Sequence, residues 1–97
     1  MQLTDQQKKH LRRLGHGLKP VVMVGDSGLS EAVLKEVEQA LAHHELIKVR
    51  VRLGDRKHRD AAIARLCDET RSHLVVRIGH VALLFRRNAE KPRIQLT

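Results

Sequence analysis

Residues 47–53 alternate strictly between apolar and basic side chains. This period of two predicts a β-strand with one buried face, because successive side chains of a strand point to opposite sides of a sheet. If helices cover only the apolar side, the cations lie together on an open face; the alternative is an ordinary solvated surface. The apolar residues are Ile47, Val49, Val51 and Leu53, and the basic ones are Lys48, Arg50 and Arg52.

Three other segments carry apolar residues at helical spacing. The first helix begins at a capping box formed by Thr4 and Gln7, and Gly15 is its expected end. The second follows Ser30 as its N-cap, and the third begins between residues 55 and 57. The apolar positions are Leu11, Leu14 and Leu18 in the first, Val33, Leu34, Val37, Ala40 and Leu41 in the second, and Ala62, Ile63, Leu66 and Cys67 in the third.

Further strands are predicted at residues 21–24, 74–78 and 81–85. The first is a continuous apolar run, which predicts a strand buried on both faces. The other two surround a Gly79-His80 turn and form a hairpin, with Leu74, Val76 and Ile78 in one strand and Val81, Leu83 and Phe85 in the other. Residues 88–97 are expected to be an irregular tail.

The sequence therefore predicts one compact α/β domain over residues 1–97, of the α+β kind, in the order α-β-α-β-α-β-β. Strands joined through a helix are normally parallel, whereas the two strands of a hairpin are antiparallel. The four-stranded sheet is accordingly expected to be mixed.

The charge of the chain bears most directly on its function. Lys and Arg number 19 against 11 Asp and Glu, a net charge of +8, which favours a polyanionic partner such as nucleic acid. Residues 1–20 carry +4, residues 26–45 carry −4 and residues 48–59 carry +5, so an acidic second helix lies among basic segments. Phe85 is the only Phe, Tyr or Trp, which argues against binding single strands by aromatic stacking.

Several classes of function are not indicated. Cys67 is the only cysteine, and the seven histidines lack the spacing of a metal site, so neither a disulfide nor a metal is expected. The apolar runs are too short for a membrane span, and the N-terminus lacks the features of a signal peptide, so we expect a cytoplasmic protein. No nucleophile elbow, Walker loop or dinucleotide-binding loop is present. The sequence therefore carries no motif that indicates a cofactor or a small-molecule substrate, and we expect neither.

The turn Gly25-Asp26-Ser27-Gly28 lies between a predicted strand and a predicted helix. Free amides and the helix dipole attract anions at such a position, and glycines let a phosphate approach the backbone closely. The alternative is a plain strand-to-helix turn in which the glycines supply unusual backbone angles. The charge of Asp26 opposes a phosphate.

Together these segments resemble a known family. The stretch from Leu11 to Val22, the motif Gly25-x-x-Gly28-Leu29-Ser30-Glu31, the stretch from His43 to Val49 and the ending Ile78-Gly79…Leu84-Phe85-Arg86 closely resemble the CRM domain (chloroplast RNA splicing and ribosome maturation). The resemblance covers nearly the whole chain and is to the stand-alone bacterial YhbY type. It implies the fold order given above, similar to the C-terminal domain of translation initiation factor three.

The resemblance also implies a non-enzymatic RNA-binding protein that associates with precursors of the large ribosomal subunit. It places a GxxG loop on Gly25 and Gly28 and RNA-facing cations at Arg12, Lys19 and Lys48. Two other classes remain open: a protein-interaction module that docks a factor through its acidic helix, and a small DNA-binding protein, for which no recognition helix is evident. The candidate RNA-binding residues are Gly25, Asp26, Ser27, Gly28, Lys8, Lys9, Arg12, Arg13, Lys19, Lys48, Arg50, Arg52 and Arg86.

Overall fold

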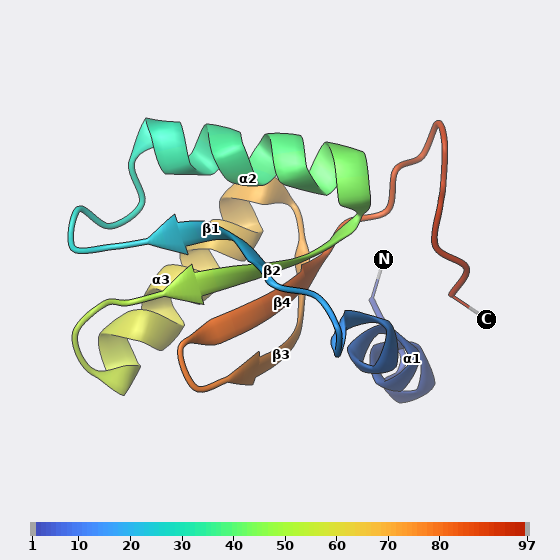
Figure 1. Ribbon diagram of the computed structural model, residues 1–97, viewed down its shortest axis with the longest axis horizontal. Helices are drawn as coiled ribbons and strands as arrows, with labels where there is room; N and C mark the ends of the chain where they lie inside the picture. The colour runs from blue at the N-terminus through green and yellow to red at the C-terminus, as the bar shows by residue number, and fades with distance from the viewer. Residues whose placement is uncertain (1, 97) are drawn as a thin grey trace.

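The computed structural model describes residues 2–96, which form three helices and four strands (Figure 1). Their order along the chain is the predicted α-β-α-β-α-β-β. The helices are α1 (Asp5–Gly15), α2 (Glu31–His44) and α3 (Arg56–Thr70), and the strands are β1 (Pro20–Val24), β2 (Leu46–Val51), β3 (His73–Ile78) and β4 (Val81–Phe85). The capping box at Thr4 and the N-cap at Ser30 are both present.

The four strands form one mixed sheet in the order β1-β2-β4-β3. β1 pairs with β2 in parallel, and β4 lies antiparallel between β2 and β3. The crossovers β1-α2-β2 and β2-α3-β3 both advance in the same direction across the sheet. Because such crossovers are right-handed, both place their helix on the same face, and Figure 1 shows α2 and α3 on one side of the sheet.

The main core lies between this covered face and the two helices. Residues of α2 and α3, including Val37, Leu41, Ile63 and Leu66, are fully buried or nearly so. They pack against alternate residues of the strands, among them the predicted apolar side of β2. The buried strand residues of this cluster are Val22, Val24, Ile47, Val49, Val51, Ala82 and Leu84.

α1 covers only one end of the opposite face. Leu11 packs there with Leu46, Leu83 and Phe85 in a second core cluster. Gly15 permits this close approach, because a Cβ at that position would lie 2.7 Å from a methyl carbon of Leu83. The rest of this face, which we call the open face, has no helix over it (Figure 1).

The prediction that residues 21–24 are buried on both faces is wrong. β1 is an edge strand, and only Val22 and Val24 point into the core. Val21 and Met23 lie on the open face and are 53% and 56% exposed. A continuous apolar run in this strand therefore reflects one buried face and one apolar exposed face.

The pattern expected for β3 also changes within the strand. The pairing of β3 with β4 shifts between Leu74 and Val76, which is the signature of a bulge. Val75 is consequently buried, whereas Leu74 and Ile78 are 39% and 71% exposed. The strand forms where the sequence predicts it, but its outermost apolar side chains do not enter the core.

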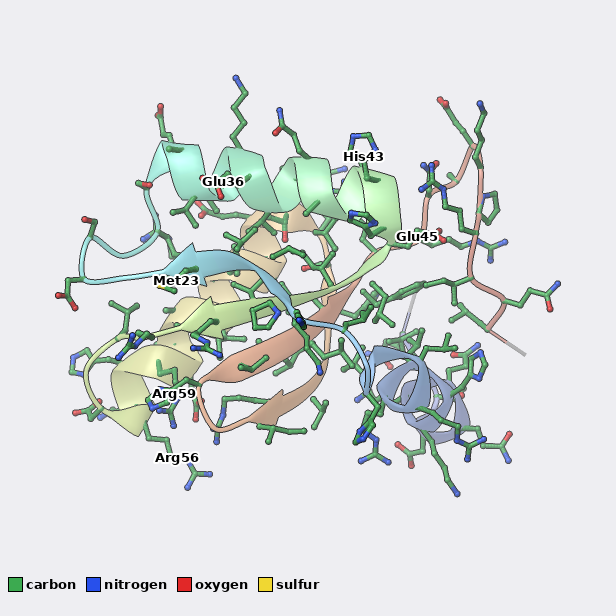
Figure 2. The ribbon with its side chains drawn as sticks, viewed as in Figure 1. Met23, Glu36, His43, Glu45, Arg56 and Arg59 are labelled. Atoms are coloured by element: carbon green, nitrogen blue, oxygen red, sulfur yellow. The ribbon has the colours of Figure 1, made fainter. Side chains whose placement is uncertain are left out.

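Residues beyond β4 form no regular structure as far as Leu96, but a buried carboxylate holds them in place. Glu45 lies between α2 and β2 and is 0% exposed (Figure 2). Its Oε2 accepts a hydrogen bond from the backbone N–H of Asn88 at 2.6 Å. Its Oε1 accepts from the N–H groups of Arg93 and Ile94 at 2.7 and 2.9 Å.

Burial alone would raise the pKa of the Glu45 carboxyl, but these three backbone donors and the nearby charge of Arg87 hold it below its ordinary value. Glu45 therefore stabilises the fold fully above its unfolded pKa of about 4.3. That contribution is lost as the pH falls through the lower, folded pKa.

We expect Glu45→Gln to lower the free energy of unfolding by about 1.5–3 kcal/mol at pH 7, because an amide replaces an ionised acceptor of backbone N–H groups. As the pH falls below about 4.3, the stability of the variant should also decrease less than that of the wild type, because the variant lacks the carboxylate that becomes protonated. Urea unfolding at several pH values measures both effects. Glu36→Gln, on the exposed side of α2, is the matched control and should change neither; equal effects from the two substitutions would contradict this role for Glu45.

Candidate nucleic-acid interface

Basic side chains gather on the open face and at its two ends. Lys48 and Arg50 project from β2 on the side opposite Val49 and Val51, as the alternation predicts. Arg52 follows the end of β2 and is exposed near the turn between β1 and α2. Arg12 of α1 lies beside this face together with Lys48 and Arg50. Lys19, in the segment before β1, lines a neighbouring hollow with Met23 and Arg50. We call these five residues the interface cations: Arg12, Lys19, Lys48, Arg50 and Arg52.

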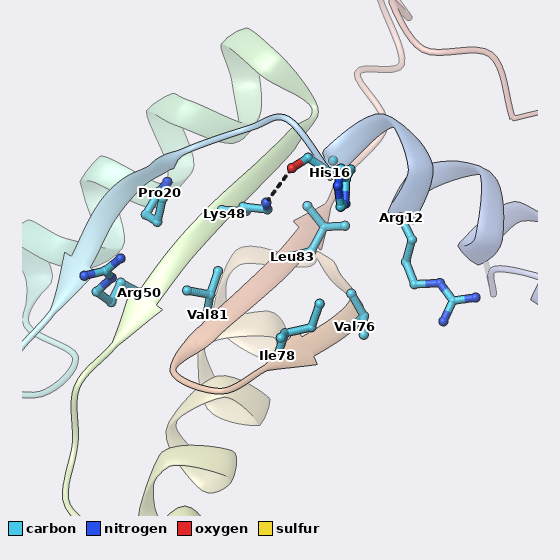
Figure 3. Close-up of a pocket in the computed structure, with 10 residues that line it drawn as sticks. Arg12, His16, Pro20, Lys48, Arg50, Val76, Ile78, Val81 and Leu83 are labelled. Carbon is cyan, nitrogen blue, oxygen red and sulfur yellow. Dashed lines mark hydrogen bonds between the residues drawn. The ribbon is translucent and has the colours of Figure 1, made fainter.

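A pocket of about 410 Å³ lies between α1 and the open face (Figure 3). Arg12, Lys48 and Arg50 line it together with His16, whose backbone carbonyl accepts a hydrogen bond from Lys48 Nζ at 3.4 Å. The sequence did not single out His16, although it stands inside the motif that carries the family resemblance. Its position became evident only once α1 was placed against β4.

The 25–28 turn lies at the other end of β1, away from α1 (Figure 1). Gly28 has a φ of +72°, and its N–H donates to the carbonyl of Gly25 at 2.9 Å. Asp26 and Ser27 are exposed, and a Cβ added at either glycine would meet no atom within 4 Å. The turn therefore leaves its backbone open to a ligand. The positive φ also favours glycine at position 28 for structural reasons, whether or not a ligand binds.

One shallow pocket of about 430 Å³ joins this turn to the open face. Met23, Gly25 and Asp26 line it on one side, and Arg52 and His80 line it on the other. Arg52 is thus the interface cation that lines the same pocket as Asp26. The structure brings the candidate turn and the end of the basic strand together, as the parallel pairing of β1 with β2 requires.

The remaining candidate cations differ in their surroundings. Lys9 and Arg13 are exposed on α1 but do not line the pocket beside it. Lys8 lies near His73 at the start of β3. The pKa of the His73 imidazole is lowered mainly by burial and, to a lesser degree, by the charge of Lys8. These three residues flank the interface cations and are not part of the same pocket.

Arg86 is separate from the interface. Its Nη1 donates to Glu38 Oε2 at 2.6 Å and to the carbonyl of Thr70 at 3.0 Å, and its Nη2 donates to the carbonyl of Glu38. The guanidinium therefore ties the end of β4 to α2 and α3 on the covered side of the sheet. Its role in the structure is to hold these elements together.

Ion pairing distinguishes the interface cations from four other arginines. Within residues 2–96, the arginines that pair with carboxylates are Arg56, Arg65, Arg77 and Arg86. None of the interface cations belongs to such a pair in the described part of the chain. Their charge is consequently available to a ligand.

The acidic block of residues 26–45 does not form one free acidic surface. Glu38 pairs with Arg86, and the carboxylate of Glu45 is buried beneath the tail. On α2 itself, Glu31 and Glu36 remain exposed. Two exposed carboxylates offer little to a basic partner, which weakens the interpretation of α2 as a docking helix.

Other kinds of site find no counterpart among residues 2–96. No group of three or more His, Cys, Asp or Glu side chains there is arranged to hold a metal ion. Cys67 is partly buried against the main core as expected, and burial raises the pKa of its thiol, which disfavours the reactive thiolate. No helix in this part of the chain has the length and apolar character needed to cross a membrane.

Comparison with known proteins identifies clear relatives. The model of the CRS1 / YhbY (CRM) domain family matches residues 3–86. The chain is 48% identical over 97 residues to "Probable RNA-binding protein PA4753" of Pseudomonas aeruginosa, covering 100% of this chain and 92% of that protein. It is 47% identical over 94 residues to a Haemophilus influenzae protein named "RNA-binding protein", covering 97% and 94% of the two chains.

A solved structure shows the same fold. The solution structure of the hypothetical protein SAV1595 of Staphylococcus aureus, described as a candidate RNA-binding protein, superposes with a TM-score of 0.85 at 33% identity. The match covers 99% of this chain and 100% of that one. The four-stranded mixed sheet with three helices predicted from the sequence is thereby confirmed.

Proposed function

Because the chain belongs to the CRS1 / YhbY (CRM) domain family, we propose that it is a non-enzymatic RNA-binding protein whose contact surface is the open face of the sheet. The observation that carries this proposal is the set of interface cations, which lie on one uncovered face and at its two ends without carboxylate partners among residues 2–96. Relatives that align over nearly their whole length are named as RNA-binding proteins, which supports RNA as the partner.

The interface cations suit the RNA backbone in particular. Phosphates supply most of the affinity of proteins for nucleic acid, through Lys and Arg contacts that release bound counterions. Arg12 stands beside one end of the pocket, Lys48 and Arg50 follow along β2, and Arg52 stands at the far end near the 25–28 turn. These four cations form a row in one direction along the sheet. A row of this kind can contact successive phosphates of an RNA backbone.

The resemblance of the sequence to the YhbY type leads us to propose a more specific role. The RNA would be ribosomal RNA in precursors of the large subunit, and the protein would act in the cytoplasm during ribosome assembly. A basic domain of 11.1 kDa with unpaired cations on one face is suited to a large folded RNA.

We expect the protein to sediment with large-subunit precursors when a cell extract is separated on a sucrose gradient at low salt. Raising the salt concentration should release it, because the contact depends on phosphates. Immunoblotting of the fractions measures both effects. If the protein is found only among free proteins at low salt, the ribosomal role is wrong, although binding to another RNA would remain testable with purified components.

Replacing Lys48, Arg50 and Arg52 together with Gln should reduce the salt slope of RNA binding by about two to three units, one for each phosphate that the protein no longer neutralises. Fluorescence anisotropy with a labelled RNA at several salt concentrations measures the slope. The matched control replaces Lys35, Arg65 and Arg71, which are exposed on α2, within α3 and at the C-cap of α3. It removes the same charge, so an equal fall in slope would show that net charge alone governs binding.

Asp26→Lys should raise RNA affinity, with the largest gain at low salt, because it removes a repulsion and adds an attraction at the 25–28 turn. The same anisotropy titration measures it. Glu36→Lys on α2 makes an identical change of charge away from the open face. If the two variants bind alike, or if Asp26→Lys binds as the wild type does, the turn is structural and the interface cations alone contact RNA.

A further inference from the structure

The open face combines its cations with exposed apolar side chains in a regular pattern. The strand pairings place residues of β1, β2, β4 and β3 side by side in rows across the sheet. In each row the cation of β2 has apolar neighbours on both sides. One row is Met23, Arg50, Val81 and Ile78, and the next is Pro20, Lys48, Leu83 and Val76.

The apolar ends of these rows form the floor of the 410 Å³ pocket beside α1 (Figure 3). Ile78 is 71% exposed, the most of any large apolar side chain among residues 2–96. A single exposed apolar residue is ordinary, but here Val76, Ile78, Val81 and Leu83 form a continuous apolar floor. The volume falls within the range of about 300–1,000 Å³ that is typical of ligand sites.

The rim of this pocket is entirely cationic or neutral. Arg12 and His16 stand on the α1 side, and Lys48 and Arg50 stand on the β2 side. None of the residues that line it is acidic. The occupant that fits such a site has a flat apolar part against the floor and negative charge at the rim.

We propose that the pocket receives an unpaired nucleobase of single-stranded or looped RNA, with the adjoining phosphates held by Arg12, Lys48 and Arg50. The proposal rests on the proposed RNA-binding function and specifies the kind of RNA that the open face takes. The far edge of the floor, on β3, lies two strands from the cations of β2, about 10 Å for strands spaced roughly 4.8 Å apart. A nucleotide spans a comparable distance from its phosphate to the far edge of its base.

Double-helical RNA would leave the floor unused. A duplex keeps its base faces stacked inside and presents phosphates and sugars to a protein. An apolar peptide would cover the floor but would leave the cationic rim without partners. Aromatic side chains are not required, because Ile, Leu, Met and Pro also pack against the faces of bases.

A comparison of two substitutions on β3 tests this inference. Ile78→Ser removes an exposed side chain from the floor, whereas Leu74→Ser, also exposed on β3, lies outside the pocket. We expect Ile78→Ser to weaken binding of a 12-nucleotide single-stranded RNA about three- to tenfold, at or below the lower end of the range for a base on an aromatic side chain, because the side chain here is aliphatic. Binding of a 12-base-pair RNA duplex should be unchanged, and Leu74→Ser should alter neither.

Methyl spectra of the whole chain give a second, direct measurement. Titration with adenosine monophosphate should shift the methyl resonances of Ile78, Val81 and Leu83, because a purine ring lies over them. Ribose 5-phosphate, which has the phosphate but no base, should leave them in place. Thermal unfolding of both serine variants establishes that they fold as the wild type does.

The results separate this inference from the proposed function. If the wild type binds both RNAs with the expected salt slope but Ile78→Ser weakens neither or weakens both alike, the base pocket is wrong and the RNA-binding function stands. Equal methyl shifts with the two small ligands would likewise contradict the pocket. If the wild type binds neither RNA, the proposed function itself fails.

Discussion

The handedness of two strand-helix-strand crossovers determines what this molecule can present to a partner. Both crossovers advance across the sheet in the same direction, so α2 and α3 must lie on the same face. A third helix, α1, precedes the first strand and is free of this constraint; it packs on the opposite face but covers only the end near Leu46 and Phe85. The surface left uncovered is therefore a consequence of chain connectivity.

β2 gives the uncovered surface its positive charge, because its side chains are apolar on one face of the sheet and basic on the other. Ile47, Val49 and Val51 pack into the main core, while Lys48 and Arg50 between them face solvent. Substitution of an exposed cation usually changes stability by less than about 0.5 kcal/mol. The charge of the open face can thus vary without loss of the fold, whereas a shift of β2 by one residue would bury the cations.

Local patterns in the sequence predicted most of the fold, and features that depend on distant partners were missed. The alternation in β2 and the capping box at Thr4 depend on near neighbours, and both are confirmed. The burial of β1 was predicted wrongly, because an apolar run does not reveal whether its strand lies at the edge of the sheet. The roles of Glu45 and Arg86 depend on partners more than 40 residues away, Arg93 for Glu45 and Glu38 for Arg86. Only the folded arrangement shows that these two charges serve stability.

The same arrangement explains how a chain with eleven acidic residues maintains a positive face. Asp60 pairs with Arg77, Glu69 with Arg65, and Glu38 with Arg86, so carboxylates are drawn toward α3 and the covered side of the sheet. The exposed pair of Glu69 with Arg65 adds little stability. All three pairs keep carboxylates away from the open face, where a nearby negative charge would oppose a phosphate. Asp26 is the exception: it lies in a turn whose backbone is open, and its negative charge opposes an anion at that end of the surface.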